Sequence, residues 1–282
     1  MFYFLLLGAY NEVNINIALF MPKFNDIDLK KWKETDIWTD SLWIISERDK
    51  TGKHSGFYHG NFVPQIPRQL ITRYTKKNDV VFDPFVGSGT TAFEAESLER
   101  HFIGIDIQKE LIEYIRGRLD VGGSFAELIE GDSASLDTFA KVKNALTKYG
   151  KKKVQFAILH PPYADIIKFS DLEDDLSNAK SLKDFLEKFS VILSNTISVL
   201  EEGRYMAIVI GDKYASGKWI PLGFYCMNEA QKLGLTLKSI VIKNMEGNRA
   251  KRNKEAIWKY RALSSDYFIF KHEYILIFKY EK

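Results

Sequence analysis

The 282-residue chain has few of the features that mark secreted or membrane proteins. Cys226 is its only cysteine, which excludes an intramolecular disulfide framework and suits a reducing compartment, so we expect a cytoplasmic protein with a buried, inert thiol. The apolar N-terminus lacks a basic n-region and a small-residue cleavage site, so no signal peptide is expected. Asn11, Glu12, Asn14 and Asn16 interrupt its apolar run before the roughly 20 residues that a membrane-spanning helix needs, and we expect no membrane association.

Internal repeats and low-complexity segments are also lacking, and the net charge of +3 is too small to identify a partner by itself. Apolar residues make up 45% and charged residues 27% of the chain, values that are ordinary for a soluble globular protein. The length suits one large α/β domain, or one domain with a small appendage. The apolar N-terminal segment is open to interpretation as a strand pair, a packing arm, a homodimer contact, or an upstream extension of a reading frame that begins at Met21.

A glycine-bearing turn follows a short apolar run in the stretch VVFDPFVGSGTT, residues 80–91. The pattern predicts a buried strand, a tight turn and the first turn of a helix. Gly87 and Gly89 allow the backbone to approach a ligand where a Cβ would collide. A Walker A phosphate loop needs a Lys before its Ser or Thr, and here Gly89 is followed directly by Thr90, so that motif is excluded. In an open α/β sheet, ligands bind at the carboxyl ends of the strands, where this turn is expected.

Apolar runs and helical periodicities alternate along the rest of the chain. This alternation predicts an α/β fold with a doubly wound, mostly parallel, seven-stranded sheet whose last two strands form an antiparallel edge pair. We expect a strand or turn around LWIIS, residues 42–46, and a polar loop at 164–180. One expected strand begins at residue 80, and the others cover 101–106, 125–129, 154–159, 205–210, 235–242 and 267–278. The expected helices cover 28–34, 67–74, 91–100, 109–119, 135–149, 182–200 and 221–233.

Two acids stand at the ends of expected strands. Asp106 lies about 20 residues after the glycine turn, where an acid hydrogen-bonds the ribose hydroxyls of a bound nucleoside, although a solvated strand-end Asp is the alternative. Asp132 follows the next strand, where it would accept a hydrogen bond from an adenine amino group. The alternative role for Asp132 is a helix N-cap, because Ser133 and Ser135 follow it.

The fourth expected strand runs into His160-Pro161-Pro162-Tyr163. Consecutive prolines fix the backbone and remove two N–H donors, so the carbonyl groups there are free to face a ligand. Tyr163 adds a flat aromatic face. Acceptors beside an aromatic plane suit a planar base with an exocyclic amino group, whereas a purely structural turn is the alternative.

Together, DPFVGSGTT, the acid of GIDI, the GD after the third strand and HPPY resemble the S-adenosylmethionine-dependent amino-methyltransferases of DNA, which methylate adenine N6 or cytosine N4. The resemblance covers roughly residues 54–280. It includes HGNFVPQIPRQLITRYTKKNDVV, similar to the segment that helps close the methionine pocket, and HEYILIFKY, similar to the last strand. It implies a Rossmann-like methyltransferase sheet and S-adenosylmethionine as cofactor, with no metal. The implied cofactor-binding residues are Phe62, Asp83, Pro84, Phe85, Gly87, Ser88, Gly89, Thr90, Asp106, Ile107 and Asp132.

The resemblance also implies direct methyl transfer to a base flipped out of the duplex, with His160, Pro161, Pro162 and Tyr163 as catalytic residues. Tyr163 would stack on the base, while the Pro161 carbonyl and His160 would orient its amino group, so that positioning carries much of the rate and no strong base is needed. This chain departs from the family at His160, where Asp, Asn or Ser is usual. A neutral His accepts a hydrogen bond through one ring nitrogen and a protonated His does not. We expect a site-specific enzyme, with adenine N6 slightly favoured over cytosine N4.

Double-stranded DNA is the expected substrate, and a basic segment provides the cations for it. Residues 238–261 contain eight Lys or Arg against two acids, interleaved with Trp258 and Tyr260, although a solvated basic loop would have the same composition. We predict N-terminal arm 1–40, methyltransferase catalytic core 41–245, basic recognition insert 246–265 and last core strand 266–282. The predicted DNA-binding residues are Arg249, Lys251, Arg252, Lys254, Trp258 and Arg261.

Two other functions stay open. An RNA amino-methyltransferase also carries a PPY after its fourth strand, but the separate RNA-binding domain usual in that group is not visible. A non-catalytic nucleic-acid-binding protein on the same fold is suggested by the departure at His160. The family further makes a cognate restriction endonuclease a candidate partner, beside the homodimer that the apolar N-terminus suggests.

Overall fold

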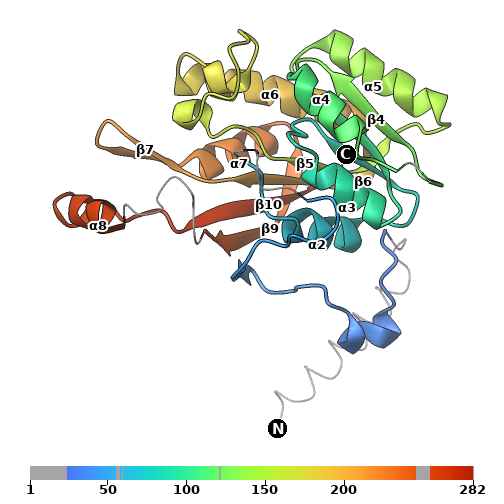
Figure 1. Cartoon of the computed structure of the whole chain (residues 1–282), viewed down its shortest axis with the longest axis horizontal. Helices are drawn as coiled ribbons and strands as arrows, with labels where there is room; N and C mark the ends of the chain where they lie inside the picture. Colours follow the sequence, from blue (N-terminus) through green and yellow to red (C-terminus); the bar gives the residue numbers. More distant parts are fainter. Residues whose placement is uncertain (1–23, 55–57, 59, 121, 246–254, 282) are drawn as a thin grey trace.

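One large mixed sheet with helices on both faces forms the body of the protein (Figure 1). The computed structural model describes residues 24–54, 58, 60–120, 122–245 and 255–281. Most of the predicted N-terminal arm, residues 1–23, therefore lies outside the described residues, and the homodimer contact predicted there lies outside them as well. None of the helices in the described ranges combines the length and the apolar character that a membrane crossing requires.

The sheet has eight strands in the order β1-β9-β10-β6-β5-β2-β3-β4. β10 pairs antiparallel with both of its neighbours, β9 and β6, while the other pairings are parallel. The strands are β1 (Leu42–Trp43), β2 (Val80–Asp83), β3 (His101–Asp106), β4 (Ala126–Glu130), β5 (Val154–Leu159), β6 (Leu200–Ile210), β9 (Leu235–Asn244) and β10 (His272–Tyr280). From β2 the chain runs outward through β3 and β4, then returns to β5 on the other side of β2, so the strand order reverses between β2 and β5. Ligands of open α/β sheets bind outside the carboxyl ends of the strands at such a reversal.

The longer helices cover the two faces of the sheet. They are α2 (Gln65–Tyr74), α3 (Thr90–Ser97), α4 (Lys109–Arg116), α5 (Leu136–Lys148), α6 (Leu182–Val199) and α7 (Leu222–Lys232). The 3-10 turns are η1 (Leu29–Glu34), η2 (Ala164–Ile166) and η3 (Leu176–Asn178). A two-stranded hairpin, β7 (Lys213–Ala215) with β8 (Lys218–Ile220), and helix α8 (Glu255–Leu263) project together at one end of the molecule, at the left of Figure 1.

Alternation along the strands separates two hydrophobic cores. Phe82 and Ile105 point to one face, where they pack with α5, α6 and α7, while Val81 and Phe102 point to the other, with α2, α3 and α4. Strands that are apolar on both sides are those of a sheet covered on both faces. Burying one large apolar side chain stabilises the fold by about 1.5–3 kcal/mol. Because both cores contain many such side chains from the central strands, they fix these strands and hence the positions of their carboxyl ends.

The predicted doubly wound sheet and the antiparallel pair of the last two strands are confirmed. The two-residue β1 forms where a strand or turn is expected around residues 42–46, and it adds an eighth strand beside β9. Two features were not expected, the β7–β8 hairpin and helix α8. The last strand also begins later than expected, at His272, because residues 267–271 lie outside the ladder. Within the loop at 164–180, which sequence treats as irregular, two short 3-10 turns form.

Candidate active site

A cavity of about 860 Å³ opens at the carboxyl ends of the central strands, a size typical of ligand pockets. Its lining comes from the segments that follow β2, β3, β4, β5 and β6, together with β10 and the segments before α2 and β10. Most of the residues predicted from sequence meet there. Those that line the cavity are Phe62, Pro84, Phe85, Gly87, Thr90, Asp106, Ile107, Asp132, His160, Pro161, Pro162, Tyr163 and Trp258.

Four predicted residues within the described chain do not line the cavity: Asp83, Ser88, Gly89 and Arg261. Arg261 is nevertheless close to it, because its guanidinium lies 5.5 Å from the ring centre of Trp258, which does line it. The other predicted DNA-binding residues, Arg249, Lys251, Arg252 and Lys254, lie outside the described residues.

Asp83 holds the glycine turn from behind. It is 1% exposed, and its carboxylate accepts hydrogen bonds from the Thr91 hydroxyl at 2.6 Å and from the backbone N–H of Phe85 at 2.9 Å. Burial raises the pKa of Asp83 to about 7, against the lowering effect of these two donors. The carboxyl therefore joins the end of β2 to the start of α3 and fixes the turn between them.

Gly89 ends that turn in a left-handed conformation, with φ +91°, and is the N-cap of α3. A Cβ built on it would lie 2.8 Å from Ile115 Cγ1, so both its backbone angle and its contact with α4 require glycine. Gly87, with φ +53°, lines the cavity itself. Gly87 thus leaves the backbone accessible to a ligand in the cavity, and Gly89 allows α3 and α4 to pack closely.

Asp106 organises the same turn from the next strand. Its carboxylate accepts from the backbone N–H of Gly87 at 2.8 Å and from that of Gln108 at 2.9 Å. Burial raises the pKa of Asp106 to about 7, and the nearby Asp175 carboxylate adds to this, while backbone N–H groups of Gln108, Gly87 and Ile107 oppose it. A carboxylate has about four acceptor positions, so the described bonds leave capacity for the hydroxyls of a ligand.

Asp132 lines the cavity beyond the end of β4. Its Oδ1 accepts from the backbone N–H of Ala134 at 2.8 Å, and the N-cap of α5 is Ser135, three residues further on. Asp132 is therefore not the helix N-cap that sequence leaves as its alternative role. Burial raises its pKa, with Asp174 as a further cause.

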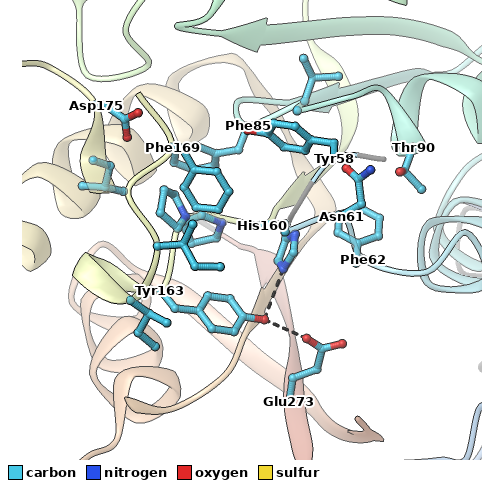
Figure 2. A pocket seen from close by; sticks show the side chains of 18 of the residues that line it. Tyr58, Asn61, Phe62, Phe85, Thr90, His160, Tyr163, Phe169, Asp175 and Glu273 are labelled. Atoms are coloured by element: carbon cyan, nitrogen blue, oxygen red, sulfur yellow. Dashed lines mark hydrogen bonds between the residues drawn. The ribbon is translucent and has the colours of Figure 1, made fainter. Parts of the chain in front are cut away.

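The segment before α2 forms one wall over the glycine turn, as Figure 2 shows for Tyr58, Asn61 and Phe62. Asn61 donates from Nδ2 to the Ser88 hydroxyl at 2.6 Å, which ties the wall to the turn. Arg48, which also lines the cavity, donates to the carbonyl of Phe62 at 2.8 Å and holds this wall in place. Sequence analysis identified only Phe62 here.

The opposite wall comes from the loop at 164–180. Phe169 lines the cavity and packs against Tyr58, with 5.9 Å between the ring centres, so the two walls meet across the opening. The loop is pinned by Asp175, whose buried carboxylate accepts from Ser170, from the Ser177 hydroxyl and from the Ser177 backbone N–H at 2.6–2.8 Å. An expected polar loop therefore supplies apolar lining.

His160 and Tyr163 lie between these walls (Figure 2). The ring of Phe62 meets that of His160 edge-on at 4.9 Å. Burial lowers the pKa of His160 to about 4, and the Lys243 ammonium adds to the lowering while Glu273 opposes it, so the imidazole is neutral at pH 7. The Tyr163 hydroxyl lies 3.2 Å from His160 Nε2 and 2.8 Å from Glu273 Oε2. Tyr163 also packs against Gly211, where a Cβ would lie 2.8 Å from its Cε2.

Aromatic residues from the projecting end form the outermost part of the cavity. Tyr214 stacks on Tyr267 with 4.3 Å between ring centres, and Phe270 packs against Trp219 at 4.2 Å. The Trp219 indole N–H donates to Asp212 at 3.0 Å, which anchors the β7–β8 hairpin at the end of β6. Sequence analysis missed these residues, and the aromatic content of 213–220 and 267–270 is the only signal that points to them.

Comparison with protein families gives a match to the family model described as DNA methylase, over residues 13–117 and 154–282. Among curated proteins, the type II methyltransferase M2.LlaDCHI of Lactococcus lactis subsp. cremoris is 40% identical over 105 residues, which are 37% of this chain and 36% of that protein. M2.DpnII of Streptococcus pneumoniae is 40% identical over 85 residues, 30% of each chain. The matches thus span about a third of the length of these relatives.

Among solved structures, TrmN from Thermus thermophilus has a TM-score of 0.49 and 15% identity to this chain, covering 79% of this chain and 50% of TrmN.

The cavity fits the cofactor of this family. Asp106 and Asp132 present carboxylates at neighbouring strand ends, and a Cβ on Gly87 would lie 3.3 Å from Tyr58 Cε1 in the space that the glycine leaves open. Phe85 and Ile107 add apolar faces beside them. Because the family model matches most of the sequence, the chain belongs to the DNA methylase family, the N6 and N4 amino-methyltransferases that use S-adenosylmethionine.

Proposed function

We propose that this chain methylates an exocyclic amino group of a base in double-stranded DNA. The observation that carries the proposal is that Asp106, Asp132, His160 and Tyr163, which stand at or just after the carboxyl ends of three different strands, line a single cavity. This cavity lies at the point where the strand order reverses. One cavity can then hold a nucleoside cofactor and a base together. The relatives are named type II methyltransferases, which supports DNA as the substrate.

S-adenosylmethionine supplies an electrophilic methyl group on a sulfonium. In our proposal Asp106 accepts from ribose hydroxyls and Asp132 from the adenine amino group of the cofactor, on the backbone surface that Gly87 leaves open. The remaining cofactor contacts would come from Phe62, Pro84, Phe85, Thr90 and Ile107, while Asp83, Ser88 and Gly89 shape the turn. Deep burial of Asp83 suits this supporting role better than direct contact.

The target base would lie flat against Tyr163 after leaving the duplex stack. A base stacked on an aromatic side chain gains about 1–3 kcal/mol, which offsets part of the cost of unstacking. The Pro161 carbonyl and a neutral His160 would accept from the amino group and direct its lone pair toward the methyl. Rigid positioning by Pro161 and Pro162 then contributes to the rate without a strong base. We favour adenine N6 slightly over cytosine N4.

DNA would approach the aromatic and basic end of the molecule. Lys259 and Arg261 are exposed on α8, and Lys218 is exposed on the hairpin beside it in Figure 1. We propose that the insert 246–265 and this hairpin contact phosphates and bases, that 41–245 and 266–282 form the catalytic core, and that 1–40 is an arm. The type II names of the relatives make a cognate restriction endonuclease a reasonable partner for a protein in the cytoplasm.

Transfer of tritiated methyl groups from S-adenosylmethionine tests this function. We expect incorporation into duplex DNA and none into RNA. Incorporation into RNA alone would identify an RNA methyltransferase, and cofactor binding without incorporation into either would identify a non-catalytic binding protein. Modification-sensitive sequencing of a host that expresses the chain would then give the base and the recognition sequence together.

Tyr163→Ala is the variant that connects the site to the activity. It removes the stacking face and should lower methyl transfer by about tenfold or more, while calorimetry finds the cofactor affinity unchanged. Tyr225→Ala, at a partly exposed position on α7, is the matched control and should behave as the parent protein. Full activity of the Tyr163 variant would remove this residue from the proposed base site.

A further inference from the structure

Four side chains form a hydrogen-bonded series that ends at His160 (Figure 2 shows its last three members). Lys243 Nζ lies 3.0 Å from Glu273 Oε1, and the other carboxylate oxygen, Oε2, accepts from the Tyr163 hydroxyl at 2.8 Å. That hydroxyl lies 3.2 Å from His160 Nε2. The side chains of Lys243 and Glu273 are only 10% and 7% exposed, so the ion pair at the start of the series is withdrawn from water.

The chemistry of Glu273 determines the direction of every bond in this series. A carboxylate paired with an ammonium accepts hydrogen bonds and has no proton to donate. Tyr163 has one hydroxyl proton, which therefore points to Glu273, and burial together with the Glu273 charge raises the pKa of Tyr163 well above 10.0 and keeps that proton in place. The Tyr163 oxygen is left as an acceptor, so the proton between Tyr163 and His160 belongs to His160 Nε2.

This direction leaves the other ring nitrogen of His160 with a lone pair. A neutral imidazole has one donor and one acceptor nitrogen, and His160 is neutral at pH 7 because burial lowers its pKa to about 4. With Nε2 as the donor, Nδ1 is the acceptor. Across the residues that the structure describes, Nδ1 makes no hydrogen bond, and His160 lines the cavity.

We propose that Glu273, held by Lys243, is a positioning residue that acts through Tyr163 to fix the Nε2–H tautomer of His160, so that Nδ1 accepts from the amino group of the target base. The inference rests on the proposed function, because an acceptor is useful only if an amino group is methylated. It accounts for histidine at a place where the family has Asp, Asn or Ser, since each of these also presents an acceptor. It also gives a buried ion pair of β9 and β10 a role in the site.

Glu273→Gln tests this with almost no change of shape. The amide oxygen would face the Lys243 ammonium, so the amide N–H would face Tyr163 and donate to it. Tyr163 would then donate to His160 Nε2, and the imidazole proton would move to Nδ1. Lys243 would remain the donor to residue 273, but the hydrogen bond between residue 273 and Tyr163 and the one between Tyr163 and His160 would both reverse. The substitution would therefore turn the acceptor at Nδ1 into a donor while each pair of atoms stays together.

Nitrogen-15 NMR of histidine-labelled protein reports the tautomer directly, with His160 assigned by its absence in His160→Asn. We expect Nε2–H in the parent protein and Nδ1–H in Glu273→Gln. Methyl transfer should fall about 10- to 100-fold in kcat, because a buried donor would oppose the amino group, while the cofactor affinity stays unchanged. Glu281→Gln, which alters the exposed Lys279–Glu281 pair just after β10, is the matched control.

A double variant tests whether Glu273 acts through Tyr163 on His160, or whether removal of the Glu273 charge lowers activity in another way. In a Tyr163→Phe background the series is cut, so adding Glu273→Gln should change kcat by less than about twofold. An equal fall in both backgrounds, or Nδ1–H in the parent protein, would overturn the inference. Absence of methyl transfer to DNA by the parent protein would instead refute the proposed function, and the NMR measurement would still decide the tautomer.

Discussion

The carboxylate of Asp83, the last residue of β2, accepts a 2.6 Å hydrogen bond from the hydroxyl of Thr91, the second residue of α3. The two residues are eight positions apart, and the glycine turn lies between them. Both are almost fully buried, at 1% exposure each. The hydrogen bond therefore joins the two ends of the glycine turn. The shape of the cofactor cavity thus depends on the Asp83 carboxyl, although Asp83 does not line the cavity.

Asp83→Ala should lower both stability and cofactor affinity. It leaves the Thr91 hydroxyl and the Phe85 N–H without their acceptor in a buried place, at a cost of about 1–3 kcal/mol in the free energy of unfolding. Urea unfolding measures the first effect, and calorimetry with S-adenosylmethionine measures the second. Asp171→Ala, whose side chain is 97% exposed, is the control. Unchanged cofactor affinity in the Asp83 variant would show that the Asp83–Thr91 hydrogen bond does not shape the cofactor cavity.

Gly89→Ala separates crowding from backbone strain when it is compared with Gly234→Ala. The two glycines have almost the same φ, +91° and +88°, so alanine costs about 1 kcal/mol at either position. A Cβ on Gly89 would also lie 2.8 Å from Ile115 Cγ1, whereas one on Gly234 meets no atom within 4 Å. We therefore expect Gly89→Ala, but not Gly234→Ala, to lose about 1–3 kcal/mol more, the usual cost of overpacking, in the free energy of unfolding, measured with urea. Equal losses would show that α4 yields to the new methyl group.

Acid should destabilise the protein through His160. The pKa of His160 is about 4 in the folded chain, below the ordinary value of 6.5. Between pH 4 and 6.5, the unfolded chain therefore binds a proton on this residue more readily than the folded chain does. This contribution to stability is complete above pH 6.5 and is lost as the pH falls toward 4. Between pH 7.5 and 5 the parent protein should lose about 1–2 kcal/mol more than His160→Asn in urea unfolding.

The same comparison controls for the carboxyls. The raised pKa values of Asp83 and Asp106, both about 7, act with the opposite sign, because their contribution to stability grows as the pH falls below 7. Both carboxyls are present in the two proteins and cancel in the difference. Parallel pH profiles of the parent protein and the His160 variant would show that the imidazole is not held neutral.

Salt dependence should identify the phosphate contacts of α8. Removing one cation that contacts a phosphate lowers the slope of log affinity against log salt by about 1. We expect this for Lys259→Gln and for Arg261→Gln in fluorescence anisotropy with duplex DNA. Lys183→Gln, with a side chain 84% exposed on α6, should leave the slope unchanged. An unchanged slope for both α8 variants would move the DNA interface to another surface.

The sheet and the strand-end residues were predictable because their signals are local. Asp106 and His160 directly follow apolar runs, and Asp132 comes three residues after Ile129. Parallel strands bring such ends together wherever they are in the sequence. Gly87 and Gly89 after a strand are a weak signal alone, and they became informative because Asp106, Asp132 and His160–Tyr163 follow at successive strand ends. These features let the sequence alone identify the strand-end part of the cavity, whereas the walls from other segments were missed.

Lys243 and Glu273 were not predictable in this way. Each is one of two charged residues in a largely apolar strand, beside Lys238 in β9 and Lys279 in β10, and no local pattern marks it. Glu273 contacts Tyr163 from 110 positions away in the sequence. Their proximity arises only from the pairing of β10 with β9, where residue 273 lies opposite residue 243. The β7–β8 hairpin was missed for a similar reason, since its Trp219 gains its role from Asp212 in the tertiary structure.

The place of β10 has a consequence for how the chain acquires its activity. This strand is the last in sequence but lies inside the sheet, between β6 and β9, and it carries Glu273 into the cavity. Until it is inserted, β6 and β9 have no partner on their facing edges, and open edges of this kind invite pairing with other chains. Closure of the sheet and completion of the site therefore both depend on β10, so we expect that a nascent chain does not assemble the full site before this strand has emerged from the ribosome.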